Sequence, residues 1–160
     1  KLHEGKIDGW EEMIDTNVKG LLYVTHSIVP GMVRRNSGIV INIGSIAGEA
    51  VYPAGNVYCA TKFAVRALSD GLRIDTVDTN IKVTNIAPAI VETNFSMVRF
   101  DDDKERAERI YKSIDALQPE DIADACLYAA TRPAHVQLPN ISISPTCQAS
   151  ATVIHRKNDN

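Results

Sequence analysis

The residues with the clearest chemical potential are Tyr58 and Lys62, which lie four positions apart in a segment with helical periodicity. On a helix this spacing places both side chains on one face. A free phenol titrates near pH ~10 and exchanges protons poorly at neutral pH, whereas a neighbouring ammonium favours the phenolate. The pair therefore predicts a general acid and base that protonates an alkoxide or deprotonates an alcohol.

Ser45 follows an apolar run, Ile39–Ile43, that is rich in β-branched residues. Such a run favours a parallel strand that is covered on both faces. Ligands of open α/β sheets bind outside the carboxyl ends of the strands. We therefore expect chemistry at Ser45, whose hydroxyl can donate a hydrogen bond to a carbonyl oxygen as that oxygen gains negative charge.

The elements that must position these residues alternate between strands and helices. The patterns predict strands near 38–44, 81–87 and 140–144, with helices over 8–35, 56–79, 104–113 and from 118 to about 132. Asp8 and Glu11 have the spacing of a capping box, Pro30 is a candidate kink, and Asp101–Asp103 form an acidic cap. This alternation is typical of an α/β fold with one parallel sheet.

Length and composition indicate one ordinary globular domain over residues 1–160, with 44% hydrophobic and 23% charged residues. The net charge of -3 and the lack of a basic stripe argue against nucleic acid as a partner. No apolar run approaches the ~20 residues of a membrane span. The widely spaced Cys59, Cys126 and Cys147 predict neither a disulfide framework nor a metal site, and favour the cytoplasm.

Three segments together resemble the short-chain dehydrogenase/reductase family: Gly44-Ser-Ile-Ala-Gly48, Tyr58-x-x-x-Lys62 and Pro88-Ala-Ile-Val-Glu-Thr93. Residues 12–17, 56–65 and 95–100 resemble most closely its branch of NADP-dependent 3-hydroxy acid dehydrogenases, which includes enzymes that act on serine and allo-threonine. The resemblance implies a Rossmann-like, doubly wound parallel sheet. It also implies an oxidoreductase that uses NADP to interconvert a secondary alcohol and a carbonyl.

The resemblance assigns a catalytic role to four residues. Tyr58 would be the general acid and base, and Lys62 would lower the pKa of Tyr58 and bind the nicotinamide ribose. Ser45 would orient and polarise the carbonyl group of the substrate. Asn17 would hold a water in a proton relay, whereas without the family it would be interpreted as a solvated or locally bonded amide.

Cofactor and substrate contacts are also implied by the resemblance. The cofactor contacts are Tyr58, Lys62, Pro88, Ala89, Val91 and Thr93. Ala89 stands where the family usually has glycine, which is harmless if its φ angle is negative. The substrate contacts are Ser45, Phe95 and Arg99, and Arg99 has the chemistry to pair with a carboxylate.

The Gly-rich phosphate-binding turn of the family is not found in this sequence, so we expect the chain to correspond to the C-terminal part of such a protein. The family implies a homo-oligomer, dimer or tetramer. A stripe of small residues on the helix at 56–79 packs either on the sheet or on a partner subunit: Ala60, Ala64, Ala67 and Gly71.

Two other functions stay open. One is a nucleotide-sugar epimerase or dehydratase, and the resemblance at residues 95–100 argues against it. The other is a catalytically silent packing or interaction module.

Overall fold

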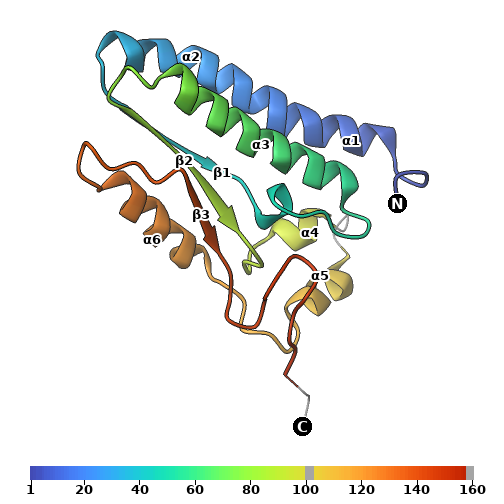
Figure 1. Cartoon of the computed structure of the whole chain (residues 1–160). Helices are drawn as coiled ribbons and strands as arrows, with labels where there is room; N and C mark the ends of the chain where they lie inside the picture. Colours follow the sequence, from blue (N-terminus) through green and yellow to red (C-terminus); the bar gives the residue numbers. More distant parts are fainter. Residues whose placement is uncertain (100–102, 158–160) are drawn as a thin grey trace.

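A computed structural model describes residues 1–99 and 103–157 and contains a parallel sheet of three strands with helices on both faces (Figure 1). The strands are β1 (Gly38–Ile43), β2 (Ile81–Pro88) and β3 (Asn140–Ile143), in the order β1-β2-β3. Gly38 pairs with Ile81 and Ile43 with Ile86, while Asn85 pairs with Asn140. The predicted α/β fold with a parallel sheet is confirmed.

The helices are α1 (Ile7–Ile14), α2 (Gly20–Arg34), α3 (Asn56–Asp75), α4 (Phe95–Arg99), α5 (Lys104–Tyr111) and α6 (Pro119–Ala130). Helices α2 and α3 cover one face of the sheet and α6 covers the other (Figure 1). Asp103 caps α5, because its side chain accepts a hydrogen bond from the Arg106 amide. Of the predicted acidic cap, residues 101 and 102 lie outside the described part of the chain.

The predicted helix over 8–35 is not regular. A π-helical turn, Asp15–Lys19, separates α1 from α2, whereas Pro30 lies inside α2, which continues to Arg34. The predicted capping box is wrong, because α1 begins at Ile7 and Asp8 already lies within its first turn. The carboxylate of Asp8 can then act only on the positive end of the helix dipole. A π-helical turn often marks a functional position, and this one contains Asn17.

Helix α3 ends at Asp75, four residues before the predicted end. The hydroxyl of Thr76 donates to the Leu72 carbonyl and that of Thr79 donates to the Thr76 carbonyl, both at 2.7 Å. Such local hydrogen bonds offer the backbone an alternative to further helical turns. The chain therefore leaves the helix early and turns into β2.

The buried side of α3 consists of Cys59, Thr61, Val65 and Ser69. Ser69 contacts the sheet directly, since its Oγ accepts a hydrogen bond from Asn42 Nδ2 of β1 at 2.9 Å. Within the predicted stripe of small residues, Ala60 and Ala67 are exposed. The interpretation that this stripe packs on the sheet is therefore wrong.

The core is centred on β2, where Val83, Ile86 and Ala87 are fully buried. Strand β1 is less enclosed than its sequence predicts, because Ile39 and Ile43 are 39% and 49% exposed. Among the described residues β1 pairs with β2 alone, so its other edge has no neighbouring strand. The expectation of a strand covered on both faces is wrong for this structure.

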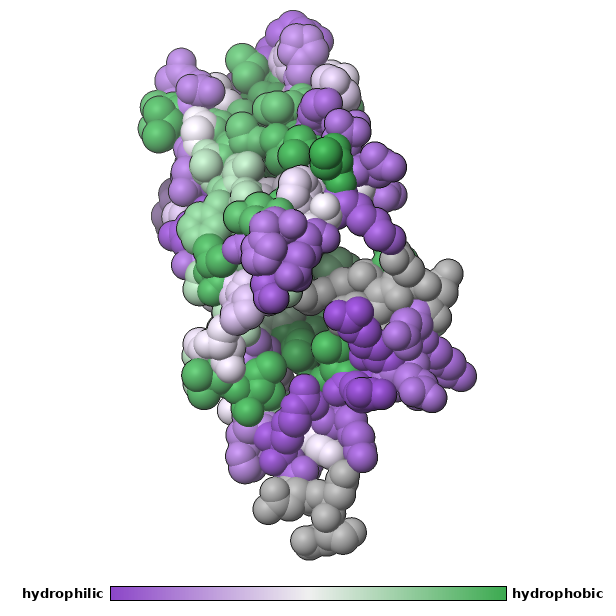
Figure 2. Space-filling view, turned by 90° about the vertical axis from the view of Figure 1, so that its right-hand side faces the viewer, coloured by the Kyte–Doolittle hydropathy of each residue, from purple (hydrophilic) through white to green (hydrophobic). Residues whose placement is uncertain are grey.

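Exposed apolar side chains continue on the neighbouring helices. Helix α2 exposes Leu22, Tyr23, Val24 and Ile28. Figure 2 shows hydrophobic residues gathered over the upper part of one face, flanked by hydrophilic ones, and a second hydrophobic group below the middle. An apolar surface of this kind commonly marks a contact with another protein element. None of the helices in residues 1–99 and 103–157 has the length and apolar character needed to cross a bilayer.

Candidate active site

Ser45 joins the carboxyl ends of two neighbouring strands. It follows β1 in an extended conformation and is the N-cap of a short 3-10 turn, Ile46–Gly48. Its Oγ accepts a hydrogen bond from the Ala47 amide at 3.1 Å and donates to the Pro88 carbonyl, at the end of β2, at 3.3 Å. The hydroxyl therefore lies at the edge where an α/β sheet binds its ligands.

The segment around Ser45 is held by close backbone approaches. A Cβ atom at Gly44 would lie 2.3 Å from Asn85 Oδ1, and one at Gly48 would lie 2.6 Å from the backbone oxygen of Lys62. A real Cβ does not tolerate either distance, so any larger residue at these positions would displace its neighbours. Both glycines are thus needed for the loop to pack against β2 and α3.

Tyr58 has a cation and an aromatic ring as neighbours. The Nζ atom of Lys62 lies 5.8 Å from the centre of the Tyr58 ring, within the range of a cation–π contact. The Phe95 ring lies 5.6 Å from the Tyr58 ring at an interplanar angle of 48°. The structure therefore brings a predicted substrate contact against the predicted acid and base.

Lys62 reaches from α3 to the end of β1, where its ammonium donates to the Ile43 carbonyl at 3.0 Å. Burial lowers the pKa of Lys62 below the usual lysine value. The Lys62 ammonium is thus held at the backbone carbonyl of Ile43, two residues before Ser45 in the chain. Its positive charge is less favourable there than in water. A lysine with a lowered pKa also exchanges its proton more readily.

Asn17 lies in the π-helical turn and bonds to α3 instead of to its own helix. Its Nδ2 donates to Thr61 Oγ1 at 3.1 Å, and Thr61 Oγ1 donates to the Tyr58 carbonyl at 2.8 Å. Thr61 is 2% exposed. Asn17 is therefore linked through Thr61 to the turn that carries Tyr58 and Lys62, a link that the sequence analysis missed although Thr61 directly precedes Lys62.

Of the predicted cofactor contacts, Pro88 ends β2, and Ala89, Val91 and Thr93 lie in the segment after it. The Ala89 amide donates to the Ile143 carbonyl at 2.8 Å. Among the described non-glycine residues, positive φ angles occur at Asn36, Ala54 and Ser113 only, so the backbone of Ala89 does not require glycine. The replacement of the usual family glycine therefore creates no backbone strain.

Val91 and Thr93 lie further along the same segment. Val91 forms an isolated parallel bridge with Leu117, and Thr93 Oγ1 accepts a hydrogen bond from the Phe95 amide at 3.2 Å. The hydroxyl of Tyr111 contacts the carbonyl groups of both Val91 and Thr93. Tyr111 was not found by sequence reasoning, because nothing in its local pattern distinguishes it from a packing residue. Helix α4 ends at Arg99, whose side chain lies outside the described part of the structure.

A polar cluster connects the Ser45 loop with β3. Glu49 accepts hydrogen bonds from Asn140 Nδ2 at 2.9 Å and from Ser142 Oγ at 2.7 Å. Asn85 Nδ2 donates to Asn140 Oδ1 at 2.6 Å, whereas for the buried Asn85 Oδ1 the described residues supply no partner. Asn85 is a polar residue inside an apolar strand pattern, and that signal could have identified this cluster from the sequence.

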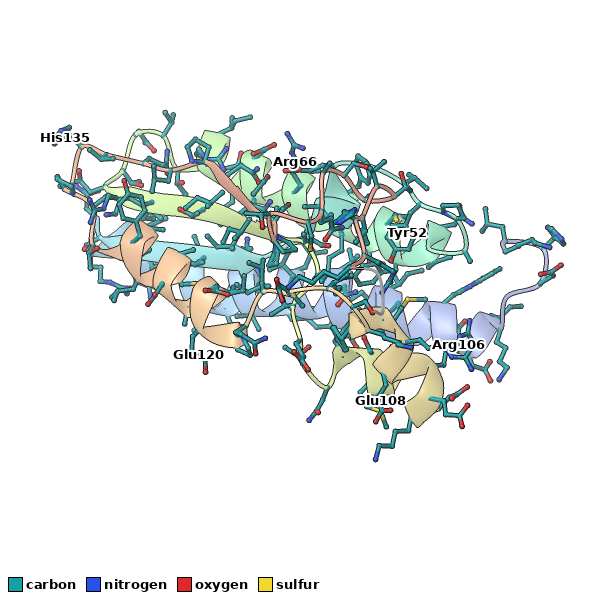
Figure 3. The ribbon with its side chains drawn as sticks, turned by 90° about the horizontal axis from the view of Figure 1, so that it is seen from below. Tyr52, Arg66, Arg106, Glu108, Glu120 and His135 are labelled. Carbon is teal, nitrogen blue, oxygen red and sulfur yellow. The ribbon has the colours of Figure 1, made fainter. Side chains whose placement is uncertain are left out.

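Metal ligands do not gather near this site. In the part of the chain that the structure describes, no three His, Cys, Asp or Glu side chains form a group that could hold a metal ion. Figure 3 shows His135, in the loop between α6 and β3, at the left end of the view, well away from Arg106 and Glu108 of α5. At the carboxyl ends of the strands the structure places the hydroxyl of Ser45, the phenol of Tyr58 and the ammonium of Lys62.

A parallel α/β sheet with this set of groups at its carboxyl edge is suited to proton transfer at an alcohol or a carbonyl. The sequence profile of the short chain dehydrogenase family matches residues 1–104. The chain belongs to this family.

Individual proteins match a larger part of the chain than the family profile does. A protein of Salmonella typhi named NADP-dependent 3-hydroxy acid dehydrogenase is 48% identical over 156 residues, which are 96% of this chain and 63% of the relative. A protein of Schizosaccharomyces pombe with the same functional name is 40% identical over 157 residues, covering 98% of this chain and 61% of the relative. The chain thus spans about 63% of the length of the bacterial relative.

Solved structures give the same result for the fold. The closed form of a serine dehydrogenase complexed with NADP+ has a TM-score of 0.92 and 46% identity, covering 98% of this chain and 64% of that one. A serine dehydrogenase from Escherichia coli has a TM-score of 0.77 and 40% identity, covering 92% and 58%. The arrangement of strands and helices is therefore that of the Rossmann-like dehydrogenases.

Proposed function

We propose that this chain is part of an NADP-dependent oxidoreductase that interconverts the 3-hydroxyl group of a 3-hydroxy acid, which is a secondary alcohol in allo-threonine and a primary one in serine, and a carbonyl group. The observation that best supports this proposal is the position of Lys62. Its Nζ atom lies 5.8 Å from the centre of the Tyr58 ring and donates a hydrogen bond to the Ile43 carbonyl at 3.0 Å. An acid and base pair is thereby held at the end of the strand that Ser45 follows. The names of the relatives support both the cofactor and the class of substrate.

The residues have distinct roles in this proposal. Tyr58 gives a proton to the substrate oxygen during reduction and removes one during oxidation. Lys62 stabilises the phenolate form of Tyr58 by its charge. Ser45 donates a hydrogen bond to the substrate oxygen and keeps its proton. For this its hydroxyl must release the Pro88 carbonyl, and a hydrogen bond of 3.3 Å is long enough to exchange easily. NADP, when bound, supplies or accepts the hydride.

We assign the end of β2 and the segment after it to the nicotinamide half of the cofactor. Lys62 offers an ammonium to the ribose, and Thr93 offers a hydroxyl. We assign further cofactor contacts to Pro88, Ala89 and Val91.

Substrate contacts and the proton relay complete the proposed site. We assign substrate contacts to Phe95 and Arg99, since an arginine pairs well with the carboxylate of a hydroxy acid. Asn17 supports the proton relay from Lys62 to solvent, and its bond to Thr61 holds it against α3.

Assembly and compartment are also proposals. The exposed apolar side chains of α2, among them Tyr23 at 68% exposure, suit a homo-oligomer, dimer or tetramer. Cys59, Cys126 and Cys147 are free thiols, which is compatible with a reducing cytoplasm.

The test uses the longest expressed protein that contains this sequence, called the full-length protein below. It is mixed with NADP+ and serine, allo-threonine or 3-hydroxypropionate, and NADPH formation is followed by absorbance. Lactate, a 2-hydroxy acid, and NAD+ serve as matched controls for the substrate and the cofactor. We expect oxidation of at least one 3-hydroxy acid with NADP+. Binding of NADP+ without oxidation of any of them would contradict the proposal, and conversion of a nucleotide sugar without net NADPH formation would favour an epimerase.

A further inference from the structure

The hydroxyl of Tyr111 joins two helices and a loop at one point. Tyr111 is the last residue of α5, and its Oη lies 2.8 Å from Ser96 Oγ in α4. The same Oη donates to the Val91 carbonyl at 3.2 Å and to the Thr93 carbonyl at 3.3 Å. Since a phenol has one proton, the arrangement that satisfies most groups has Ser96 donating to Tyr111, and Tyr111 sharing its proton between the two carbonyls.

The burial of Ser96 makes its contact with Tyr111 difficult to replace with water, whereas Tyr111 and Val91 are half-buried and Thr93 is exposed. Ser96 is 4% exposed, although it lies on a short helix near the surface. Removal of the Tyr111 hydroxyl would leave the buried Ser96 hydroxyl without this partner, while the Val91 and Thr93 carbonyl groups would turn to water. A buried polar group without a partner is unfavourable, so the segment would shift towards conformations that expose it.

The segment that is hydrogen-bonded to Tyr111, residues 91–96, also contacts Tyr58 of the proposed site through Phe95. Thr93 accepts the amide hydrogen of Phe95, and the Phe95 ring lies 5.6 Å from the Tyr58 ring. Figure 1 shows α4 and α5 close together beyond the carboxyl ends of the strands. The position of Phe95 against Tyr58 therefore depends on a segment that is also bonded to Leu117 through its backbone and to which α5 is hydrogen-bonded through the Tyr111 hydroxyl.

We propose that Tyr111 is a positioning residue that holds residues 91–96 over Tyr58 and thereby sets the affinity for cofactor and substrate. The inference rests on the proposed function. Tyr111 lies outside the set of reacting groups, and it acts through Thr93 and Phe95. A change at Tyr111 is therefore expected in the Michaelis constants more than in the turnover number.

The test compares Tyr111→Phe with the parent in the full-length protein. This change keeps the ring and removes only the hydroxyl. We expect KM for NADP+ and for the hydroxy acid to rise about tenfold, since a lost net hydrogen bond has roughly this effect on an equilibrium. We expect kcat to change by less than about threefold, because Tyr58, Lys62 and Ser45 are untouched. Trypsin should also cleave faster at Lys104, Arg106 and Arg109, which lie in α5.

The matched control is Tyr128→Phe. Tyr128 lies on α6, is 52% exposed and has the Arg132 guanidinium 4.0 Å from its ring centre. The control should leave both KM values and the cleavage rate unchanged. Ser96→Ala removes the other hydroxyl, and its effect should not add to that of Tyr111→Phe if the two groups act as one unit.

The outcomes separate this inference from the proposed function. A full-length protein that oxidises no hydroxy acid overturns the function, whereas the dissociation constant of NADP+ and the trypsin cleavage rate still test Tyr111. Values within about twofold of the parent for Tyr111→Phe in both measurements would overturn the positioning role. If Tyr111→Phe fails to fold, the same weakening of NADP+ binding is required of Ser96→Ala, and its absence there overturns the inference.

Discussion

Gly48 lies directly against the backbone carbonyl of Lys62, and a Cβ atom at position 48 would stand 2.6 Å from that oxygen. Gly48 is buried in the loop that follows Ser45. The opposing atom belongs to the backbone of α3, which cannot move aside as the end of a flexible side chain can. The loop after Ser45 and the helix turn that carries Lys62 are therefore positioned by the same contact.

Gly48→Ala should consequently destabilise the fold and disturb the site. We expect the free energy of unfolding to fall by about 1–3 kcal/mol, the usual effect of an added methyl group in a packed region. Urea denaturation of the full-length protein measures it. Gly9→Ala in α1 is the control, because its Cβ would meet nothing within 4 Å and alanine favours the helix. Equal free energies of unfolding of Gly48→Ala and Gly9→Ala would show that the loop after Ser45 moves away from α3 without a loss of stability.

Tyr58→Phe should remove most of the turnover while the fold persists. The ring and its contact with Phe95 are kept, and only the proton-transferring hydroxyl is lost. We expect kcat to fall about 10²–10⁴-fold, the usual contribution of a positioned acid or base. Tyr128→Phe is the control, because Tyr128 is 52% exposed on α6 and lies outside the proposed site. Steady-state rates of Tyr58→Phe within a few-fold of the parent would exclude Tyr58 from the proposed role.

The rate of alcohol oxidation should rise with pH as the acid and base loses its proton. Lys62→Met removes the neighbouring ammonium, so the midpoint of this rise should move up towards the value of a free phenol, about 10. Rates are measured at saturating NADP+, because Lys62 is also a proposed cofactor contact. An unchanged midpoint in a variant that still binds NADP+ would argue against the electrostatic role of Lys62.

The burial of Lys62 also predicts a pH dependence of stability. Since burial lowers the pKa of Lys62, the unfolded chain binds more protons than the native state between the lowered value and the usual lysine value of about 10.4. The free energy of unfolding should therefore rise as pH rises through this window, so that the native state becomes more stable. Below the window Lys62 is charged in both states, and the full cost of burying its ammonium lowers the stability. Urea denaturation at several pH values should show this contribution in the parent and not in Lys62→Met. If the free energy of unfolding changed with pH in the same way in the parent and in Lys62→Met, the prediction would be contradicted.

The 160-residue chain on its own should self-associate. The free edge of β1, with Ile39 and Ile43 partly exposed, is an open template for pairing with another strand. Light scattering coupled to size-exclusion chromatography at several concentrations measures the association. Ile39→Lys should reduce it, because a charge on an edge strand opposes pairing. A chain that stays monomeric at every concentration and binds NADP+ would show that the exposed edge has no such effect.

The sequence by itself determined the features that depend on spacing within one element. The apolar runs near 38–44 and 81–87 predict parallel strands, and the observed strands agree within one residue at either end, although β1 is less buried than predicted. The four-residue spacing of Tyr58 and Lys62 places them on one side of α3, because the period of a helix is set by its backbone. The position of Ser45 at a carboxyl end follows from the direction of its strand.

Only the tertiary structure decided the features that depend on how elements approach one another. The bond from Asn17 to Thr61 joins residues 44 positions apart, and hydrophobic periodicity did not reveal the π-helical turn that contains Asn17. Tyr111 reaches Val91 and Thr93 only because α5 folds back over the loop after β2. Local spacing is fixed by backbone geometry, whereas a contact between elements depends on the packing of side chains that lie far apart in the sequence.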